Sequence, residues 1–463
     1  MVSYDIIVIG SGAAGLYCAH QLNKEGYKVV VVEADQRIGG RTRQDVDFTQ
    51  WPIELGGEMI HGGDTLYYQL AKENNWGIFE VFSMELFSQN SKNTFFYLGR
   101  ERKLISQDQV DDDMSMLFKA LGSMKEDTQG MTQEQIGEMN LLELLVKKGV
   151  PYRVLGLADA VYSKTWGTNL DRIGIREAIR EDEKPQAILK NYKIQQSSKA
   201  LVDFLANGLE IKTNWRAKSV DYRDGGGVSV RSYNGKTITA KAAVVTVPLT
   251  ILKENDINFV PALPQRKLDA INVIGMDAGM KIIAKFNKKF WRQDCQLVLC
   301  GDSPVPQIWM DGPPLRPLDK QKPAEFVVTG FITGDQAKSI ASLSPAAQIK
   351  AFLNQLDSMF GNSQDWTPAT NCFISHIVYD WCKNPFVRGA YSFPSIIPSS
   401  FKYKESPNQI LSEFVDKKIF FAGEATATQY ELSTINGALQ TGLRAYHEIK
   451  ENLPLTSIRD SKL

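Results

Sequence analysis

The chain has 463 residues, 43% of them hydrophobic and 23% charged, which is typical of a soluble globular enzyme with two or three domains. Lysine plus arginine equals aspartate plus glutamate at 53 each, so no global charge attracts nucleic acid or an anionic membrane. Five scattered cysteines without a CxxC pair disfavour a disulfide framework or a metal site, and no uncharged apolar run approaches the roughly 18 residues of a membrane span.

The N-terminal segment predicts one βαβ unit. Residues 4–9 (YDIIVI) form a β-branched apolar run that stops at a glycine, the pattern of a fully buried parallel strand. A helical pattern follows, and residues 28–33 (KVVVVE) predict a second buried strand. Strand, glycine turn, helix and strand within about 30 residues are typical of a nucleotide-binding fold.

The glycine turn GSGAAG has the spacing of a phosphate-binding loop. Gly10 permits a tight turn, Gly12 lets a pyrophosphate approach the backbone, and Gly15 lets helix and strand pack closely. Glu33 ends the second strand, where an acid accepts ribose hydroxyls and disfavours a 2′-phosphate. The alternative for this loop is a glycine turn without a ligand. Behind the strand, the pair Gly39–Gly40 and Arg41 could hold further phosphate oxygens, although a solvated basic turn is the alternative.

The middle and the C-terminal part of the chain predict a discontinuous nucleotide domain. Residues 80–195 predict several helices of mixed polarity. Their acidic stretch at 111–113 is expected to be the solvent-exposed start of a helix. Strands return at 217–231 and 242–248. Near the end, KIFFAGE (418–424) is a buried strand leading into a Gly/Ala-rich helix at 437–449. We therefore expect a nucleotide domain built from separated segments, with a second domain inserted between them.

The last three residues are Ser461, Lys462 and Leu463. Terminal SKL is an address read by the peroxisomal import receptor. We therefore expect peroxisomal delivery if the source is eukaryotic, and a cytoplasmic location otherwise. Chance occurrence is the alternative.

Four blocks of sequence together resemble the flavin-containing amine oxidase family, and most closely its polyamine oxidases (acetylpolyamine and spermine oxidases). They are VIGSGAAG (8–15), VVEADQRIGGRTR (31–43), ELGGEMIHG (54–62) and FFAGEATA (420–427). The family also includes monoamine oxidases, L-amino acid oxidases and histone lysine demethylases. The resemblance runs from residue 4 to about 449 and is loosest over 80–195.

The resemblance implies an α/β fold. We expect a Rossmann-type FAD-binding domain of the glutathione-reductase/amine-oxidase kind and an inserted α+β substrate domain with a mixed sheet and helices. The FAD-binding domain would comprise residues 1–80, 195–270 and 408–455, the substrate-binding domain residues 81–194 and 271–407, and the tail residues 456–463.

The resemblance also implies non-covalent FAD, held by residues from both ends of the chain. The expected cofactor-binding residues are Gly10, Ser11, Gly12, Ala14, Gly15, Glu33, Ala34, Gly40, Arg41, Gly56, Gly57, Glu58, Met59, Val220, Trp381, Gly423, Glu424, Thr434 and Ile435. Ser11, Ala14 and Gly15 would face the pyrophosphate and Glu33 the adenosine ribose. The 56–60 backbone, with Arg41, would border the flavin.

Other matched positions concern the adenine and the far end of the flavin. The backbone of Val220 would contact adenine, and Glu424 would bind the ribityl chain. The backbone of Thr434 and Ile435 would meet the pyrimidine end of the ring. Ala390 stands where monoamine oxidases carry the flavin-linked cysteine, which is the reason to expect non-covalent attachment.

A lysine on an apolar strand is the candidate catalytic residue. The segment GMDAGMKIIAKFNKKFW (275–291) resembles the family's lysine strand, and Lys281 matches the catalytic lysine, which holds a water against the reactive nitrogen of the flavin. A lysine is costly to bury unpaired, so its presence indicates a function. The alternatives are an edge lysine that reaches solvent and Lys285, which alternation places on the same face.

Three residues are the expected substrate contacts. Tyr391, in WCKNPFVRGAYSF (381–393), matches one wall of the aromatic enclosure, and Thr434, in STINGA, stands at the second wall. His61, in IHG, matches the histidine that touches substrate in acetylpolyamine and spermine oxidases. Met59, where polyamine oxidases usually carry tryptophan, and Asn436, where the family usually carries histidine, leave the exact amine open.

The expected function is oxygen-dependent oxidation of a polyamine or N-acetylpolyamine, with hydrogen peroxide as a product. A monoamine or an L-amino acid is the alternative substrate, and an amino acid would require Arg172, Arg176 or Arg180 to face its carboxylate. An inactive FAD-bound scaffold is a further alternative. Histone demethylation is disfavoured because the long helical hairpin and extra N-terminal domain of those enzymes are not found, and desaturases or porphyrinogen oxidases generally lack the lysine.

Overall fold

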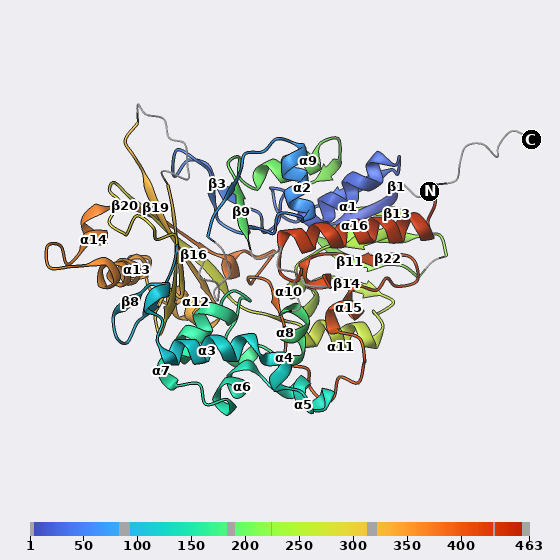
Figure 1. The fold of residues 1–463 in the computed structure, drawn as a ribbon. Coiled ribbons are helices and arrows are strands. Elements are labelled where there is room, and N and C mark those ends of the chain that lie inside the picture. Colours follow the sequence, from blue (N-terminus) through green and yellow to red (C-terminus); the bar gives the residue numbers. More distant parts are fainter. Residues whose placement is uncertain are drawn as a thin grey trace, which may run out of the picture. The chain divides into compact units, whose positions relative to one another are not determined.

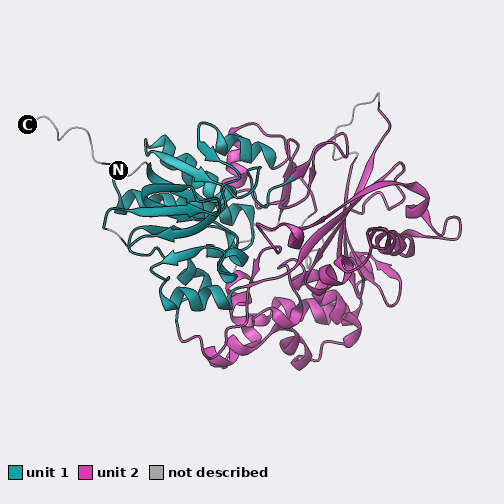
Figure 2. Ribbon diagram, turned by 180° about the vertical axis from the view of Figure 1, so that it is seen from behind, with its two compact units in different colours: residues 1–43, 198–274, 403–463 teal, residues 44–197, 275–402 magenta. Residues whose placement is uncertain are grey.

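The structure is a computed structural model. It describes residues 4–82, 93–182, 190–223, 225–312, 322–428 and 431–455. The SKL sequence at 461–463 lies outside the described residues. The chain divides into two compact units, which Figure 2 distinguishes by colour. Unit 1 comprises residues 1–43, 198–274 and 403–463, and unit 2 comprises residues 44–197 and 275–402.

The first boundary of this division differs from the expected one. The sequence predicts this boundary at residue 80, whereas the first segment of unit 1 ends at residue 43. The reason is that residues 44–80 pair with partners in unit 2: strand β5 (Ile60–His61) and strand β6 (Ile78–Glu80) both flank β9 (Asn191–Ile194). The other boundaries, expected near 195, 270 and 408, lie at 198, 274 and 403.

Unit 1 contains a parallel sheet of the predicted βαβ kind. Its order is β10-β2-β1-β13, and β22 also pairs with β13 in parallel; β12, β11 and β14 continue the sheet beyond β13. The strands are β1 (Tyr4–Ile9), β2 (Val29–Val32), β10 (Glu210–Lys212), β11 (Ala217–Asp221), β12 (Val228–Ser232), β13 (Thr237–Val245), β14 (Asn258–Val260) and β22 (Ile419–Phe421). The central strand β1 is β-branched and buried at four consecutive positions, as a strand covered on both faces requires.

Two helices from opposite ends of the chain pack together in unit 1. Helix α1 (Ala13–Lys24) lies beside α16 (Ile435–Asn452), in blue and red in Figure 1. A Cβ on Gly442 would lie 2.4 Å from the carbonyl oxygen of Ala14, so only a glycine permits this approach. Helix α9 (Lys199–Ala206) also packs on α1. The other helices of the unit are α10 (Leu249–Lys253), α11 (Gln265–Val273), α15 (Pro407–Ser412) and the short η6 (Glu424–Thr426).

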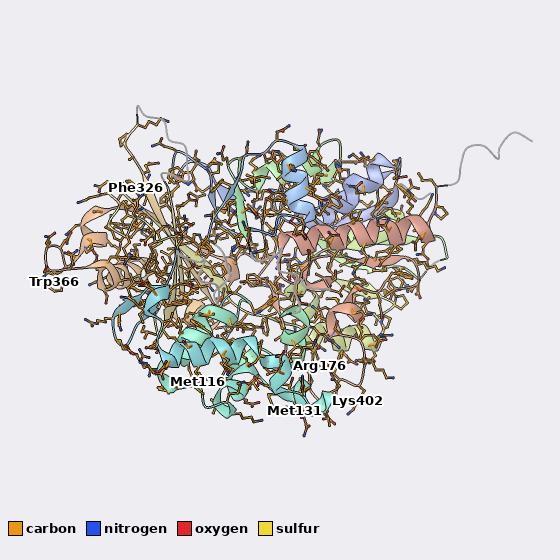
Figure 3. All side chains as sticks on the ribbon, in the orientation of Figure 1. Met116, Met131, Arg176, Phe326, Trp366 and Lys402 are labelled. Carbon is orange, nitrogen blue, oxygen red and sulfur yellow. The ribbon has the colours of Figure 1, made fainter. Side chains whose placement is uncertain are left out.

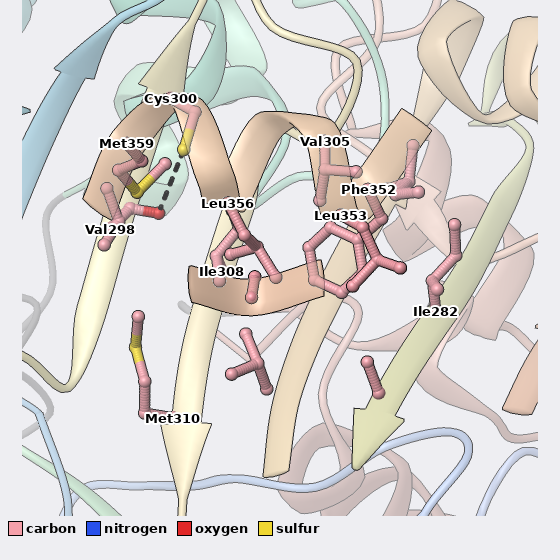
Figure 4. Close-up of a cluster of buried hydrophobic side chains, with 14 of the residues drawn as sticks. Ile282, Val298, Cys300, Val305, Ile308, Met310, Phe352, Leu353, Leu356 and Met359 are labelled. Carbon is pink, nitrogen blue, oxygen red and sulfur yellow. Dashed lines mark hydrogen bonds between the residues drawn. The ribbon is translucent and has the colours of Figure 1, made fainter. Parts of the chain in front are cut away.

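Unit 2 is organised around a second sheet with the order β20-β16-β19-β18-β17-β7-β8. The strands are β7 (Thr94–Leu98), β8 (Lys103–Ile105), β16 (Gly279–Phe286), β17 (Leu297–Gly301), β18 (Gln307–Asp311), β19 (Phe326–Thr333) and β20 (Phe373–Asp380). Helix α13 (Pro345–Phe360) covers one face, where Phe352 and Leu356 meet Ile282 of β16 and Ile308 of β18 (Figure 4). Because side chains alternate along a strand, Lys281 belongs to the opposite face of β16.

The rest of unit 2 is a set of short elements. The helices are α2 (Leu66–Glu73), α3 (Asp112–Gly122), α4 (Met124–Asp127), α5 (Gln133–Glu138), α6 (Leu141–Lys147), α7 (Tyr152–Ala158), α8 (Ile175–Asp182), α12 (Gly334–Ala341), α14 (Pro368–Cys372), and the short η1 (Gln107–Gln109), η2 (Asp159–Ser163), η3 (Leu170–Arg172) and η5 (Trp381–Lys383). Two small sheets pair β3 (Gln44–Asp45) with β4 (Ile53–Glu54) and β15 (Gly275–Met276) with β21 (Ser392–Phe393).

Several local predictions can be compared directly with these elements. The first strand is confirmed at 4–9, and the acidic stretch is confirmed as a helix start, because the Asp111 carboxylate accepts from Met114 N at the N-terminus of α3. The C-terminal helix begins at Ile435, two residues before the expected start. Strand β7 was not predicted. In the described part of the chain, every helix is too short or too polar to cross a membrane.

Candidate active site

The glycine turn after β1 has the geometry that its sequence predicts. Gly10 has φ +107°, which a residue with a side chain rarely adopts. A Cβ on Gly15 would lie 2.2 Å from the carbonyl oxygen of Gly10, so this glycine allows α1 to pack against the turn. The N-terminus of α1 has no side-chain cap, which leaves backbone N–H groups to bind phosphate oxygens.

Gly12 differs from its two neighbours in what surrounds it. A Cβ built on Gly12 would meet no atom within 4 Å, so its missing side chain is not required by packing. A Cβ built on Gly40, in the second glycine pair, would lie 3.2 Å from the Cα of Gly12. The two glycine segments therefore lie together, and the open space at Gly12 fits a pyrophosphate approaching the backbone. This observation shows that the turn fits a dinucleotide such as FAD.

The carboxylate of Glu33 connects the end of β2 to the turn. Its Oε2 accepts hydrogen bonds from the backbone nitrogen of Ser11 at 2.8 Å and from the hydroxyl of Ser11 at 2.6 Å, and its Oε1 accepts from Asp35 N at 2.8 Å. We predicted that Ser11 would face the pyrophosphate. Its side chain is fully buried, and Glu33 supplies the acceptor that a buried hydroxyl requires; the role of Ser11 at the pyrophosphate stays a prediction. Ala34, the next predicted residue, is half-buried.

Two predicted cofactor residues from distant parts of the chain form an ion pair in unit 1. Arg41 Nη1 lies 2.8 Å from Glu424 Oε1, and the Glu424 side chain is only 7% exposed. Gly423, immediately before it, has φ +131°, and its backbone nitrogen donates to Thr441 Oγ1 of α16 at 2.9 Å. The AGE segment after β22 is thus fixed to both the second glycine segment and the C-terminal helix.

The remaining predicted residues of unit 1 lie at strand and helix positions. Val220 is fully buried in β11. Thr434 is the N-cap of α16: its hydroxyl accepts from Gly437 N at 2.8 Å and donates to the carbonyl oxygen of Glu431 at 3.0 Å. Ile435 is the first residue of that helix. We predicted Thr434 as a substrate contact, and the structure adds a capping function that a threonine directly before a helix could have indicated.

In unit 2, Lys281 is buried on the face of β16 opposite to α13. Its side chain is 3% exposed, and its ammonium donates to the carbonyl oxygen of Glu54 at 3.0 Å, to that of Gly56 at 2.9 Å and to Glu58 Oε2 at 2.7 Å. Three acceptors match the three N–H donors of an ammonium. The same nitrogen lies 5.4 Å from the centre of the Trp309 ring, within the range of a cation–π contact. Lys281 is therefore held as a buried cation.

The rival residue Lys285 has a different environment. Its ammonium donates to the carbonyl oxygen of Phe48 at 2.7 Å and lies 3.3 Å from Glu325 Oε1. Its side chain is 17% exposed, against 3% for Lys281. Both lysines lie on the predicted face, and only Lys281 contacts the predicted flavin-bordering segment at 56–60.

Glu58 has a second cationic partner that the sequence reasoning missed. Its Oε1 is in ion-pair contact with Lys193 of β9, and Lys193 Nζ also lies 3.4 Å from Asp311 Oδ2 at the end of β18. Burial raises the pKa of the Glu58 carboxyl, but the attraction of Lys193 and Lys281 outweighs burial and lowers this pKa to about 2. Lys193 lies in the short strand NYKI, so the argument that selected Lys281, a lysine on an apolar strand, could have found it as well.

Trp381 fixes the same segment from another direction. Its indole nitrogen donates to the carbonyl oxygen of Leu55 at 2.9 Å, and its side chain is buried. Lys281, Trp381 and the segment Gly56, Gly57, Glu58 and Met59 were predicted as parts of one site. The structure brings them together in unit 2.

His61 and Tyr391, the predicted substrate contacts of unit 2, are both oriented by hydrogen bonds. The Nδ1 of His61 lies 2.6 Å from Asn191 Oδ1, and the amide nitrogen of Asn191 donates to the carbonyl oxygen of Phe82 at 3.1 Å. The hydroxyl of Tyr391 donates to the carbonyl oxygen of Thr165 at 2.9 Å. A Cβ on Gly167 would lie 2.7 Å from the Tyr391 ring, so this glycine makes room for the ring.

The fold and this arrangement define a dinucleotide-binding protein with a buried lysine beside a glycine-rich segment. The model of the family described as flavin containing amine oxidoreductase matches residues 155–449, and that of an NAD(P)-binding Rossmann-like domain matches residues 8–73. The chain therefore belongs to the flavin containing amine oxidoreductase family, and its cofactor is FAD.

Comparison with individual proteins agrees with this membership. Lysine-specific histone demethylase 2 from Homo sapiens is 27% identical over 96% of this chain and 53% of its own length. Polyamine oxidase 3 from Oryza sativa subsp. japonica is 26% identical over 96% of this chain and 88% of its own length. The structure of cyclohexylamine oxidase from Brevibacterium oxydans IH-35A has the same fold, with a TM-score of 0.80 at 19% identity over 97% of this chain and 99% of that chain. The chain spans about half the length of the human and mouse histone demethylases that it matches.

Proposed function

We propose that this protein is an FAD-dependent amine oxidase that acts on a polyamine or an N-acetylpolyamine. Bound FAD would accept a hydride from the carbon next to an uncharged amine nitrogen and would then reduce dioxygen to hydrogen peroxide, while water hydrolyses the resulting substrate imine to an aldehyde and the shortened amine. The buried ammonium of Lys281 is the observation that carries this proposal.

The chemistry expected of Lys281 follows from its burial. Reduction of dioxygen passes through negatively charged species, and a fixed cation in a water-poor site stabilises such charge far more than the same cation in water. The two backbone carbonyls and Glu58 hold the ammonium in one position, so no reorganisation is needed when negative charge develops. A solvent-exposed lysine would lack both properties.

The contacts of His61 support an amine substrate. Because the Asn191 amide nitrogen donates to Phe82, its oxygen faces His61, and the Nδ1 of His61 is then the protonated nitrogen. In the neutral ring this assignment makes Nε2 an acceptor, which suits an N–H group of an amine. The polyamine class is favoured by the similarity to polyamine oxidases over 88% of the length of the rice protein.

The contacts of three arginines disfavour an L-amino acid substrate. The Nη2 of Arg172 donates to both carboxylate oxygens of Asp335, at 2.8 and 2.9 Å, and its Nη1 contacts Asp277. Arg176, labelled in Figure 3, and Arg180 both pair with Glu177, at 2.9 and 3.1 Å. Each of the three arginines considered for a substrate carboxylate is thus engaged with a carboxylate of the protein, Arg176 through Nε alone, whereas its buried Nη2 has no hydrogen-bond partner among the described residues.

A peroxide-coupled screen of the purified holoprotein tests the proposal. The panel contains spermine, spermidine, their N-acetylated forms, monoamines and L-amino acids. We expect peroxide with at least one polyamine or acetylated polyamine. Peroxide with monoamines or amino acids alone would support the alternative substrates, and a holoprotein that releases none with any amine would be an FAD-bound scaffold.

We also propose peroxisomal delivery through the terminal SKL, which lies outside the described residues. The support is the sequence of the last three residues and the agreement between peroxide formation and a compartment that consumes peroxide. A fluorescent fusion that keeps the free C-terminus should colocalise with a peroxisomal marker in eukaryotic cells. A matched fusion lacking residues 461–463 should remain diffuse, and equal distribution of the two would contradict the proposal.

A further inference from the structure

Resting on the proposed function, we propose that Glu58 is a positioning residue that keeps Lys281 protonated, and that Lys193 sets how strongly Glu58 does so. The resemblance assigns the Glu58 position to the cofactor only through its backbone. The structure places its side chain between two buried lysines. The inference therefore concerns a function of the carboxylate that the glycine-rich motif does not contain.

Four buried charged side chains, including Lys281 and Glu58, lie in a row of ion pairs. Lys281 contacts Glu58 Oε2, Lys193 contacts Glu58 Oε1, and Lys193 also contacts Asp311. The exposed fractions of the side chains are 3% for Lys281, 10% for Glu58, 5% for Lys193 and 7% for Asp311. Cations and anions alternate along this row, and the four charges sum to zero.

Removal of the Glu58 carboxylate would change the charge balance around Lys281. Two buried ammonium groups would remain with one carboxylate, and the ion pair that the structure records for Asp311 is with Lys193. Backbone carbonyls of Glu54 and Gly56 would still accept from Lys281, but carbonyls carry no net charge to offset an ammonium. A buried lysine without a counter-ion loses its proton more easily, by up to three to five pH units.

Other ionisable groups lie on the elements around Lys281. On the segment that supplies its acceptors, the Glu54 carboxylate accepts from the Gln44 side chain at 3.2 Å. On β20, Tyr379 is the register partner of Lys281, and its ring packs on Trp381. On its own strand, Lys285 is engaged with Glu325. Among the carboxylates of the described residues, Glu58 is the one for which the structure records an ion pair with Lys281.

The strand also offers a matched control. Lys285 comes from the same face of β16 and contacts one backbone carbonyl and one glutamate, as Lys281 contacts carbonyls and Glu58. Glu325→Gln removes the glutamate that pairs with Lys285 and leaves the ion pairs of Glu58 with Lys281 and Lys193 unchanged. The effects of Glu58→Gln that do not appear in Glu325→Gln are therefore specific to Lys281 and Lys193.

The experiment compares four holoproteins: wild type, Glu58→Gln, Glu58→Gln with Lys281→Met, and Glu325→Gln. The visible absorption spectrum of bound FAD and the thermal unfolding temperature are measured from pH 6 to pH 10. In Glu58→Gln we expect a spectral titration with a pKa about two to four units below the ordinary lysine value near 10.4. The added Lys281→Met should abolish this titration, and wild type and Glu325→Gln should not show it.

The unfolding temperatures provide a readout that does not depend on the flavin. A lysine whose pKa is lowered in the folded state binds its proton more weakly there than in the unfolded chain, so stability rises with pH between the two pKa values. The deficit of Glu58→Gln relative to wild type should therefore shrink from pH 7 to pH 10. Both changes are expected. A pH-independent spectrum, or a deficit that is equal at the two pH values, would overturn the inference.

One further variant keeps the test decisive. If Glu58→Gln does not fold, Glu58→Gln with Lys193→Met removes one anion and one cation together, and the same titration must then appear. Where both proteins fold, the titration in this double variant must lie at higher pH, because the neighbouring cation is gone. A wild-type protein that lacks FAD or activity would refute the proposed function. A wild type with both, whose Glu58→Gln form shows no titration, would refute only the inference.

Discussion

The Nζ of Lys281 lies 2.7 Å from Oε2 of Glu58, and both side chains are almost completely buried. One residue belongs to the sheet of unit 2, and the other to the glycine-rich segment that precedes β5. Because the carbonyls of Glu54 and Gly56 come from the same segment, five consecutive residues supply all three acceptors of the ammonium. The lysine and the segment are thus placed relative to one another by charge as well as by packing.

Lys281→Met should leave FAD bound and slow turnover. The methionine has a similar length but no charge, so the cation is lost and the strand is kept. We expect reoxidation of the reduced holoprotein by dioxygen to slow by roughly 10² to 10³-fold, the range found when one electrostatic stabiliser is removed. Stopped-flow mixing of the reduced protein with oxygenated buffer measures this step. The control is Lys285→Met, and wild-type reoxidation in Lys281→Met would refute the role of the lysine.

Gly12→Ala and Gly15→Ala should separate cofactor binding from folding. A Cβ at Gly12 meets no protein atom, so Gly12→Ala should leave the apoprotein within about 0.5 kcal/mol of wild type and weaken FAD binding at least about tenfold. A Cβ at Gly15 meets the Gly10 carbonyl at 2.2 Å, so Gly15→Ala should destabilise the apoprotein by about 1–3 kcal/mol or more. Denaturant unfolding and FAD titration give both quantities. Unchanged FAD affinity in Gly12→Ala would contradict the placement of the pyrophosphate.

The stability contributed by Glu58 should disappear in acid. Its pKa is about 2 in the folded protein, below the ordinary value near 4.3, so ionised Glu58 stabilises the fold at neutral pH by on the order of 3 kcal/mol. A lowered pKa means that this contribution is complete above about pH 5 and is lost as the pH falls toward 2. The difference in urea midpoint between wild type and Glu58→Gln should therefore shrink from pH 5 to pH 3. A constant difference would show that the carboxylate does not titrate in this way.

Acid precipitation should release the flavin completely. Ala390 is buried and offers no thiol for attachment, and Gly279 of β16 makes room for its methyl group, because a Cβ on Gly279 would lie 2.5 Å from it. Trichloroacetic acid should leave a colourless pellet and all absorbance at flavin wavelengths in the supernatant. Yellow colour that stays with the pellet through denaturing washes would contradict non-covalent binding.

The nucleotide-binding half was predictable because its sequence constrains the backbone locally. A β-branched run, glycines at three defined positions and an acid after the second strand each have one dominant structural interpretation, and β1 and the turn at Gly10 match it. The choice of Lys281 over Lys285, in contrast, does not follow from the local strand pattern. Alternation places both on one face, the family resemblance selects Lys281, and the two lysines have different contacts in the folded chain.

The predictions were weaker where residues distant in sequence meet. The Lys193–Glu58 pair joins β9 to the glycine-rich segment, and no local pattern indicates which carboxylate a buried lysine will reach. The expected domain boundary at residue 80 differs from the compact-unit boundary at residue 43 for a similar reason: β5 and β6 pair with β9, more than a hundred residues later in the chain. Strand β7 was missed because its five buried residues, TFFYL, are too few for periodicity to separate strand from helix.

The ion pair between Arg41 and Glu424 has a consequence for biosynthesis. During translation, the glycine turn and Arg41 are synthesised before Glu424 and the helix α16 that packs on α1. The sheet that contains the N-terminal strands therefore stays incomplete until all of unit 2 has been synthesised, because its strand β22 follows unit 2 in the chain. The contacts of Arg41 and α1 with Glu424 and α16 therefore form only after residues 424–452 have been synthesised.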